Sequence, residues 1–388
     1  MAVDRRTLLC HATLLAATTL AACAPRAGVE QSRNVGDLFF IGTHGTQVHA
    51  TRLDPRSGEM TTIGPVADVP NPTWAVRHPD LPVLYVASQL GGDGKSEGSV
   101  VAFRIDPETG ALARTGEAKA GGGGTTHLWF DTASRTLLAA NYASGSVASI
   151  AVHADGSLGE RVSLVQATGT GPHRRQASPH AHGVAVDPSG RFALVADLGA
   201  DRIFVYPLAR RTHALADGSG PARHLALPPG TGPRHFAFHP NGRFVYLLGE
   251  LTAEIFTLRW DAASGTLSQV QALSTDAPGF AGNRSVAEVA VSRDGRFVYA
   301  SNRGDSAIVV HAIDPRTGTL RQIQRIPSGG ATPWSFAIHP GGRWMIVANE
   351  KSDRLNLFRI DPSTGTLSDT GKTLPIPKPV SVTFAGTR

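Results

Sequence analysis

Two arginines, a glutamate and a histidine stand at positions where sister segments of this chain carry mostly small or apolar residues. Arg234 and His182 each lie five residues before a repeated turn, and Glu250 and Arg303 each lie at the end of the strand that follows one. Exposed ion pairs contribute little to stability, so this cluster is better explained by an anionic ligand than by salt bridges that merely line a channel. The corresponding residues are Thr73, Thr126, Ala287 and Trp334 in the first slot and Gln89, Tyr142, Leu198 and Glu350 in the second.

The slots are defined by a segment that recurs six times, with starts at residues 78, 131, 187, 239, 292 and 339. A typical copy reads HPNGRFVYLLGE from His239: a turn, an alternating aliphatic strand and a Gly or Asn break, with a further strand after it. A period of roughly fifty residues built from short strands is typical of a propeller. Inner strands of all blades converge on the axis of such a ring, so we expect His182, Arg234, Glu250 and Arg303 to meet at the mouth of the axial channel.

A second motif, D-x-x-S/T-G, counts the blades independently. Clear copies start at Asp54, Asp106, Asp261, Asp314 and Asp361, and degenerate versions lie near Asp155 and around residues 210–215. Seven turns predict seven four-stranded blades. The first turn is preceded only by DLFFIGT from Asp37, and the chain ends on a lone strand, Val380 to Phe384. Pairing these two end strands in one blade would close the ring and remove its open edges.

The first 23 residues are predicted to be a targeting segment, outside the fold. Arg5-Arg6-Thr7-Leu8-Leu9 resembles a twin-arginine export signal, and an apolar stretch at 12–20 leads to Leu20-Ala21-Ala22-Cys23, which resembles a bacterial lipobox. Cys23 would then be the lipidated first residue of the mature chain, residues 24–36 a tether, and residues 37–388 the propeller. The alternative is a cleaved signal without lipid. We expect a periplasmic protein held to the membrane only by that lipid.

Composition limits the remaining possibilities. The only other cysteine, Cys10, lies inside the signal, so the mature domain has neither a disulfide nor a thiol nucleophile. A formal charge of +6 without runs of Lys and Arg among aromatics does not favour nucleic-acid binding. No zinc-binding spacing is present, so we expect no metal and no cofactor, with a calcium ion in the channel as the open alternative. No Gly-x-Ser-x-Gly elbow is present either, which disfavours a serine-hydrolase mechanism. A monomer is the default expectation.

Several longer motifs resemble the lactonase family of seven-bladed propellers, which includes the propeller-type 6-phosphogluconolactonases and the fungal carboxy-muconate cyclase. The resemblance covers nearly the whole mature chain and rests on these segments: Asn141 to Ser146, Ser178 to His182, Asp197 to Asp201, Gly232 to His235, Ala287-Glu288 and Ser301 to Gly304. It implies a metal-independent lactone-processing site made by His182, Arg234, Glu250 and Arg303. The chain departs from the family pattern at Gly249, Trp334 and Ser88-Gln89, so the resemblance specifies the fold better than the substrate.

The resemblance implies hydrolysis of a sugar lactone, with one arginine stabilising the developing oxyanion and the other holding an anionic group. Glu250 between two arginines should have a lowered pKa, whereas histidine ordinarily titrates near neutral pH. We therefore expect His182 to be the base and Glu250 the orienting group. His180, Tyr142 and Arg175 are further candidates for substrate binding at the mouth, where a role in loop structure is the simpler interpretation.

Other residues are predicted to be structural. His78, His239 and His339 share a turn slot, and residues 121–124 form a blade connection. Strand alternation predicts that His127 and His235 face away from the channel. Two other functions stay open: a catalytically silent propeller that binds a peptide or envelope partner, and a muconate-type lactone cycloisomerase.

Overall fold

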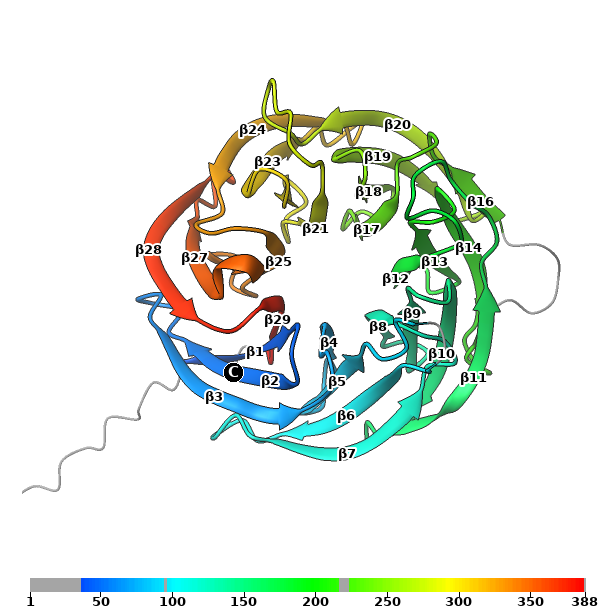
Figure 1. Ribbon diagram of the computed structural model, residues 1–388, viewed down its shortest axis with the longest axis horizontal. Helices are drawn as coiled ribbons and strands as arrows, with labels where there is room; N and C mark the ends of the chain where they lie inside the picture. The colour runs from blue at the N-terminus through cyan, green and yellow to red at the C-terminus, as the bar shows by residue number, and fades with distance from the viewer. Residues whose placement is uncertain (1–35, 94–95, 216–222, 387–388) are drawn as a thin grey trace, which may run out of the picture. The chain divides into compact units, whose positions relative to one another are not determined.

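The computed structural model describes residues 36–93, 96–215 and 223–386. The predicted signal segment, Cys23 and nearly all of the tether lie outside these residues. Residues 37–384 form seven antiparallel sheets arranged in a ring, one sheet per blade (Figure 1). The described residues contain no α-helix and one short 3-10 helix, η1 (Glu350–Ser352), and no helical segment among them is long and apolar enough to cross a membrane. The predicted all-β propeller with seven blades is confirmed.

The strands lie in four concentric layers, and every blade except the fourth contributes one strand to each layer. The innermost strands are β29 (Pro379–Phe384), β4 (Trp74–Arg77), β8 (Thr125–Asp131), β12 (Ala181–Val186), β17 (Pro233–Phe238), β21 (Val286–Val291) and β25 (Pro333–Ile338). The second strands are β1 (Asp37–Thr43), β5 (Val83–Ser88), β9 (Thr136–Asn141), β13 (Phe192–Asp197), β18 (Phe244–Gly249), β22 (Phe297–Asn302) and β26 (Trp344–Asn349).

The two outer layers differ in burial: most residues of the third strands are buried, whereas those of the outermost strands are largely exposed or half-buried. The third strands are β2 (Gln47–Leu53), β6 (Ser99–Ile105), β10 (Ser146–Val152), β14 (Arg202–Ala209), β19 (Glu254–Asp261), β23 (Ala307–Ile313) and β27 (Arg354–Ile360). The outermost are β3 (Met60–Asp68), β7 (Leu112–Lys119), β11 (Leu158–Gln166), β20 (Thr266–Ser274), β24 (Leu320–Pro327) and β28 (Leu367–Pro375). In the fourth blade β14 pairs with two short strands, β15 (Ala214–Leu215) and β16 (Arg223–Ala226), so this sheet has five strands where four were predicted.

Pairing of β29 with β1 closes the ring as predicted. Phe39 of β1 lies opposite Phe384 of β29, and Ile41 lies opposite Val382. The innermost strand of this blade therefore comes from the end of the chain and the other three from its beginning. Both edges of β1 are thereby paired, one with β2 and the other with β29.

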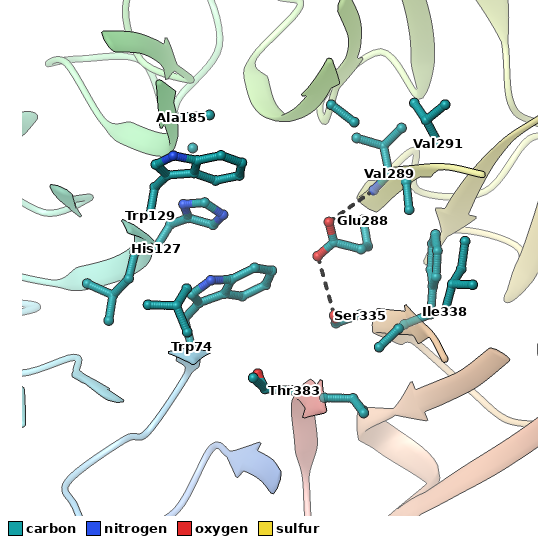
Figure 2. A pocket seen from close by; sticks show the side chains of 18 of the residues that line it. Trp74, His127, Trp129, Ala185, Glu288, Val289, Val291, Ser335, Ile338 and Thr383 are labelled. Atoms are coloured by element: carbon teal, nitrogen blue, oxygen red, sulfur yellow. Dashed lines mark hydrogen bonds between the residues drawn. The ribbon is translucent and has the colours of Figure 1, made fainter. Parts of the chain in front are cut away.

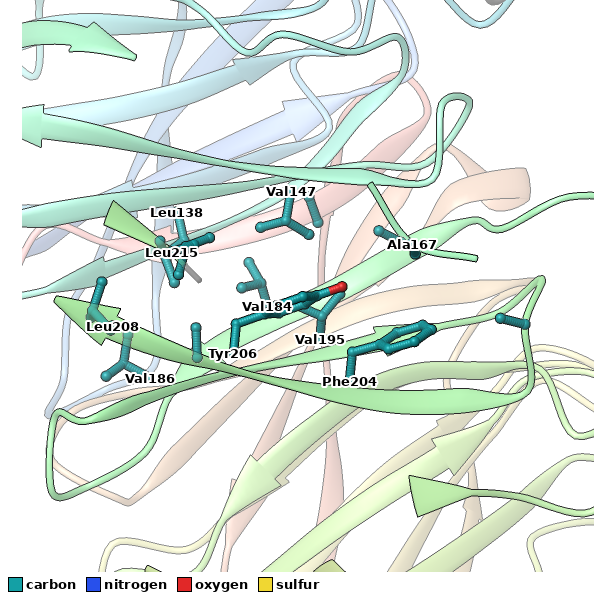
Figure 3. Close-up of a cluster of buried hydrophobic side chains, with 14 residues drawn as sticks. Leu138, Val147, Ala167, Val184, Val186, Val195, Phe204, Tyr206, Leu208 and Leu215 are labelled. Carbon is teal, nitrogen blue, oxygen red and sulfur yellow. The ribbon is translucent and has the colours of Figure 1, made fainter. Parts of the chain in front are cut away.

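The core lies between neighbouring blades, because the second and third strands are apolar on both faces. Figure 3 shows one such layer, where Leu138 and Val147 of the third blade pack against Val195, Phe204 and Tyr206 of the fourth. Every residue is buried in the second strands β13, β18, β22 and β26. Apolar burial on both faces explains why these strands were visible in the sequence as continuous aliphatic runs.

The repeated turns join the third and fourth strands and also hold one blade to another. In the turn from Asp314 to Gly318, Gly318 adopts a φ of 73° and its carbonyl accepts a hydrogen bond of 3.0 Å from the hydroxyl of Tyr246 in the preceding blade. A Cβ at Gly318 would lie 2.5 Å from the ring of Phe244, so glycine is required here on two grounds. The histidine turn residues also behave as predicted: the Nδ1 atom of His239 accepts a hydrogen bond from the backbone of Asn241.

Candidate functional site

The site lies where the innermost strands begin and the second strands end. His182 is the second residue of β12, and Arg234 is the second residue of β17. Glu250 directly follows β18, and Arg303 directly follows β22. Just beyond the antiparallel pair of Pro233 and Gly249, the backbone N–H of Glu250 donates a hydrogen bond to the carbonyl of Gly232, so Glu250 and Arg234 lie at the same end of the inner strands. The four residues that the repeat comparison selected are thus brought together from three consecutive blades.

Glu250 is the centre of this cluster. Its Oε2 atom lies 3.1 Å from Nε of Arg234 and its Oε1 atom 2.9 Å from Nη2 of Arg303. Nε2 of His182 is 3.9 Å from Oε2, which is too far for a direct hydrogen bond. Only 3% of the Glu250 side chain and 2% of the Arg234 side chain are exposed. A buried carboxylate is therefore held between guanidinium groups, with an imidazole beside it.

A third arginine, Arg175, completes the group. Its Nη1 atom donates a hydrogen bond of 2.5 Å to Oε1 of Glu250, and its Nη2 atom donates one of 2.8 Å to the hydroxyl of Tyr142. The Tyr142 ring stacks on the ring of His180, with centroids 4.5 Å apart. Arg175 is about one-third exposed, unlike the other two arginines. Of the three additional candidates, Arg175 contacts Glu250 directly, Tyr142 contacts Arg175, and His180 supports Tyr142.

The loop that carries Arg175 is fixed by the next residue. Gln176 is fully buried, and its Nε2 atom donates hydrogen bonds to the Leu198 carbonyl and to Oδ1 of Asp201. Asp201 also accepts hydrogen bonds from the backbone N–H groups of Gly230 and Gly232, which lead into β17. One carboxylate therefore ties the Arg175 loop to the segment that presents Arg234. This long-range tie gave no signal in the sequence.

The charges of the cluster are unbalanced. Burial alone would raise the pKa of Glu250, but Arg303, Arg234 and Arg175 outweigh it and lower that pKa to about 2. Burial, together with the neighbouring Arg303, lowers the pKa of Arg234 to about 10. At neutral pH three guanidinium groups thus face one carboxylate, and the predicted lowering of the Glu250 pKa is confirmed. The excess positive charge favours an anionic group or a developing oxyanion.

His182 differs from the expectation that it titrates near neutral pH. Burial and, after it, the positive charge of Arg234 lower its pKa well below the usual 6.5. The imidazole is therefore uncharged at neutral pH and can accept a proton. Its edge meets the ring of Tyr142, with centroids 5.5 Å apart.

Trp334 forms one wall of the site, a role that the sequence analysis did not predict. The Trp334 ring lies 4.4 Å from the Arg303 guanidinium carbon and contacts the His44 ring edge to face, with centroids 4.6 Å apart. Nδ1 of His44 is 3.3 Å from Oε1 of Glu350, the last member of the second slot. An indole next to a guanidinium presents a flat apolar surface to whatever the arginines bind.

The prediction that His127 and His235 face away from the channel is wrong. Their rings come from different blades and contact each other, with centroids 4.7 Å apart, and the His235 ring also contacts those of His182 and Trp74. The cause is a register shift at the start of the inner strands, between Thr125 and His127 in β8 and between Pro233 and Phe236 in β17. Such bulges break the strict alternation of side chains, so both Arg234 and His235 reach the axis.

Within the described ranges, no group of three or more His, Cys, Asp or Glu side chains is arranged to hold a metal ion. The site itself carries three guanidinium groups, one carboxylate and one neutral imidazole. This set can bind an anion, stabilise an oxyanion and accept a proton.

Comparison with known proteins identifies the family to which the chain belongs. The chain is 31% identical to a 6-phosphogluconolactonase of Bacillus subtilis over 351 residues, which cover 89% of this chain and 98% of that one. Among solved structures, the periplasmic gluconolactonase PpgL of Pseudomonas aeruginosa is 32% identical with a TM-score of 0.82, over 90% of this chain and 98% of that one. A putative 6-phosphogluconolactonase from Bacteroides fragilis is 27% identical with a TM-score of 0.81, over 91% and 99% of the two chains. The model of the seven-bladed β-propeller lactonases matches residues 38–384, and the chain belongs to this family.

Proposed function

We propose that this protein is a carboxylic-ester hydrolase that opens a sugar lactone by adding water at the Glu250 cluster. The observation that carries the proposal is the placement of three arginines and a neutral histidine around one buried carboxylate. The relatives named as 6-phosphogluconolactonase and gluconolactonase support the substrate class. No feature of the site favours a cycloisomerase or a silent scaffold over this function.

In the proposed reaction, a water molecule adds to the lactone carbonyl carbon, and its proton passes to the imidazole of His182. The carbonyl oxygen becomes an oxyanion, which Arg234 or Arg303 stabilises; one such donor is worth about 3 to 4 kcal/mol. The ester C–O bond then breaks, and the imidazolium returns the proton to the departing ring oxygen. Glu250 positions the arginines and stabilises the transient charge on His182.

Acid release followed by pH-stat tests this proposal. The purified protein is incubated with aldonolactones, 6-phosphogluconolactone and muconolactones, and the uncatalysed rate is subtracted. Faster acid release from any one lactone supports hydrolysis. Flat traces across the whole panel would contradict it and favour the binding scaffold.

The panel contains phosphorylated and unphosphorylated lactones because two features point to different substrates. The excess guanidinium charge suits a phosphate, whereas a sugar phosphate should be scarce outside the inner membrane, where an export signal would send the protein. Trp334 also gives one side of the site a flat ring on which an uncharged sugar can stack. We propose an unphosphorylated aldonolactone as the preferred substrate of an exported enzyme.

We also propose that the chain is exported, lipidated at Cys23 and active in the periplasm as a monomer. The motifs in residues 5–23 support export and lipidation, and the similarity to the periplasmic gluconolactonase PpgL supports the periplasmic location. Cell fractionation of the natural chain and of Cys23→Ser tests the anchor. The variant should move from the membrane fraction to the soluble periplasmic fraction, and a membrane-bound Cys23→Ser variant would contradict lipidation.

A further inference from the structure

A second cavity lies at the other end of the inner strands from the Glu250 cluster. Its volume is about 870 Å³, and its walls come from the later residues of the inner strands, including Phe130, Phe238, Ile338 and Phe384. Arg234 begins β17, whereas Phe236 and Phe238 of the same strand line this cavity. The cavity is therefore distinct from the site described above, and the proposed reaction makes no use of it.

One part of the cavity wall is formed by polar and aromatic side chains. Trp74, His127, Glu288 and Ser335 line it, and Figure 2 shows Glu288 projecting from one wall toward Trp74 and His127 on the other. The His127 ring lies 4.5 Å from that of Trp74. A carboxyl group thus faces an indole and an imidazole across a largely apolar space.

Glu288 and Glu250 are two buried glutamates of one channel with opposite surroundings. Glu250 contacts three arginines, whereas no Lys or Arg nitrogen in the described part of the chain lies within ion-pair distance of the Glu288 carboxyl. The Glu288 Oε2 atom is 3.2 Å from Nδ1 of His235 and accepts a hydrogen bond of 3.3 Å from Ser335, and Oε1 accepts one of 3.1 Å from the Val289 N–H. A buried charged carboxylate is unfavourable without a cation nearby. Among the described residues, the Glu288 carboxyl has no Lys or Arg partner that would offset this cost.

The groups around Glu288 do not supply that partner. Arg234 and His235 of β17, His127 of β8 and Ser335 of β25 face it. Burial keeps His127 and His235 uncharged at neutral pH, since it lowers the pKa of each well below 6.5. Arg234 acts only at a distance and is engaged with Glu250. Burial outweighs these influences and raises the pKa of Glu288 to about 7.

We propose that this cavity binds a small organic monocation, with its ammonium group between the Glu288 carboxyl and the Trp74 indole and its apolar body along the aromatic wall. The ligand supplies the positive charge that the protein does not, and an indole face attracts an ammonium group. Arg77 and Arg293 also line the cavity, beyond the apolar strand residues. They should repel a second positive charge, so a diamine should bind more weakly than a monoamine of the same length.

Isothermal titration calorimetry with benzyltrimethylammonium, and with benzyl alcohol as an uncharged probe, tests the proposal on the whole protein. We expect the cation to bind at least about tenfold more tightly than the alcohol, because its charge is attracted by the Glu288 carboxylate and by the face of the Trp74 indole. Glu288→Gln should remove about tenfold or more of the cation's affinity and leave that of the alcohol unchanged. The exposed Glu160→Gln variant loses the same charge and should bind like the natural protein.

Two further measurements keep the test decisive if Glu288→Gln fails to fold. Trp74→Leu should also weaken cation binding, and pentylammonium should bind more tightly than the corresponding diamine. Affinity of the permanently charged probe should fall as the pH decreases from 8.5 to 5.5, because protonation of Glu288 removes its charge. Equal affinity for cation and alcohol, a pH-independent affinity, or undiminished binding to Glu288→Gln would each overturn the proposal. Lactone hydrolysis does not enter any of these measurements.

Discussion

Glu250 and His182 lie side by side yet suit different tasks. Three arginines occupy both oxygens of the Glu250 carboxylate and lower its pKa to about 2, whereas the imidazole of His182 is neutral and its Nδ1 atom has no hydrogen-bond partner among the described residues. We therefore expect His182→Ala to lower kcat by about a hundredfold to ten-thousandfold, the usual worth of a general base. Glu250→Gln should keep measurable activity. Steady-state kinetics on the best lactone of the panel compares the two variants.

Folding has to be measured for both variants, because Glu250→Gln leaves three guanidinium groups without their carboxylate. Breaking a buried ion pair from one side costs about 3 to 5 kcal/mol, so this variant should melt at a lower temperature than His182→Ala. If folded Glu250→Gln is inactive while His182→Ala retains activity, Glu250 is the base and the assignment is reversed.

The pKa of His182 also predicts the pH dependence of the reaction. A base must be unprotonated to act, and burial beside Arg234 lowers the pKa of this histidine well below 6.5. Activity should therefore stay constant as the pH falls through 6.5 and decline only at lower pH. A profile of kcat/KM between pH 4.5 and 8 checks this. A decline centred at or above pH 6.5 would show that the acting base is not His182 in this environment.

Single residues were predicted from the sequence where the repeat supplied an internal comparison. Arg234 and His182 differ from their sister residues in the same slot, and the structure places them together. Arg175 lies in a loop without counterparts, and its contact with Glu250 depends on Gln176 and Asp201, distant partners that no local pattern reveals. Trp334 was noticed as a departure, but its packing on Arg303 required coordinates.

At the scale of elements, the register shifts near the start of β8, β12, β17, β21 and β25 shape the channel. A bulge lets two successive residues of β17 approach the axis. Arg234 then contacts Glu250, and the His235 ring contacts the rings of His127 and Trp74. Strict alternation with a period of two cannot predict such a shift. The strands themselves were predictable, because their aliphatic runs and turns recur, whereas the local break in pairing carries no periodic signal.

Gly183 tests how closely these strand starts pack. A Cβ at this position would lie 2.5 Å from the backbone carbonyl oxygen of Arg234, which cannot move without shifting β17. We expect Gly183→Ala to lower kcat/KM by about tenfold to a hundredfold, since a displacement of about 1 Å can cost a hundredfold in rate. Gly116→Ala on β7 is the matched control, because a Cβ there meets nothing within 4 Å. Equal kinetics of the two variants would mean that β12 and β17 separate without disturbing Arg234.

At the scale of the whole molecule, the ring could be predicted because each blade repeats the same hydrophobic pattern and turn. The degenerate turn around residues 210–215 marks the one blade whose outer edge differs, with β15 and β16 in place of one long strand. The sequence could not predict that one buried glutamate of the channel contacts three arginines while the other has no Lys or Arg partner in the described part of the chain. This contrast arises from side chains of many blades whose charges are summed only when the ring closes.

Closure by β29 is the property on which both ends of the channel depend. This strand fills the innermost place of the first blade, where Val380 and Ser381 are buried and Phe39 pairs with Phe384. A chain ending at Lys378 would leave the inner edge of β1 unpaired and the core between the first and last blades open to water. We expect it to lose cooperative thermal unfolding and to aggregate, as followed by circular dichroism and size-exclusion chromatography. A control chain ending at Gly386 keeps β29 and should unfold like the full chain; native-like melting of the shorter chain would show that the ring holds without its closing strand.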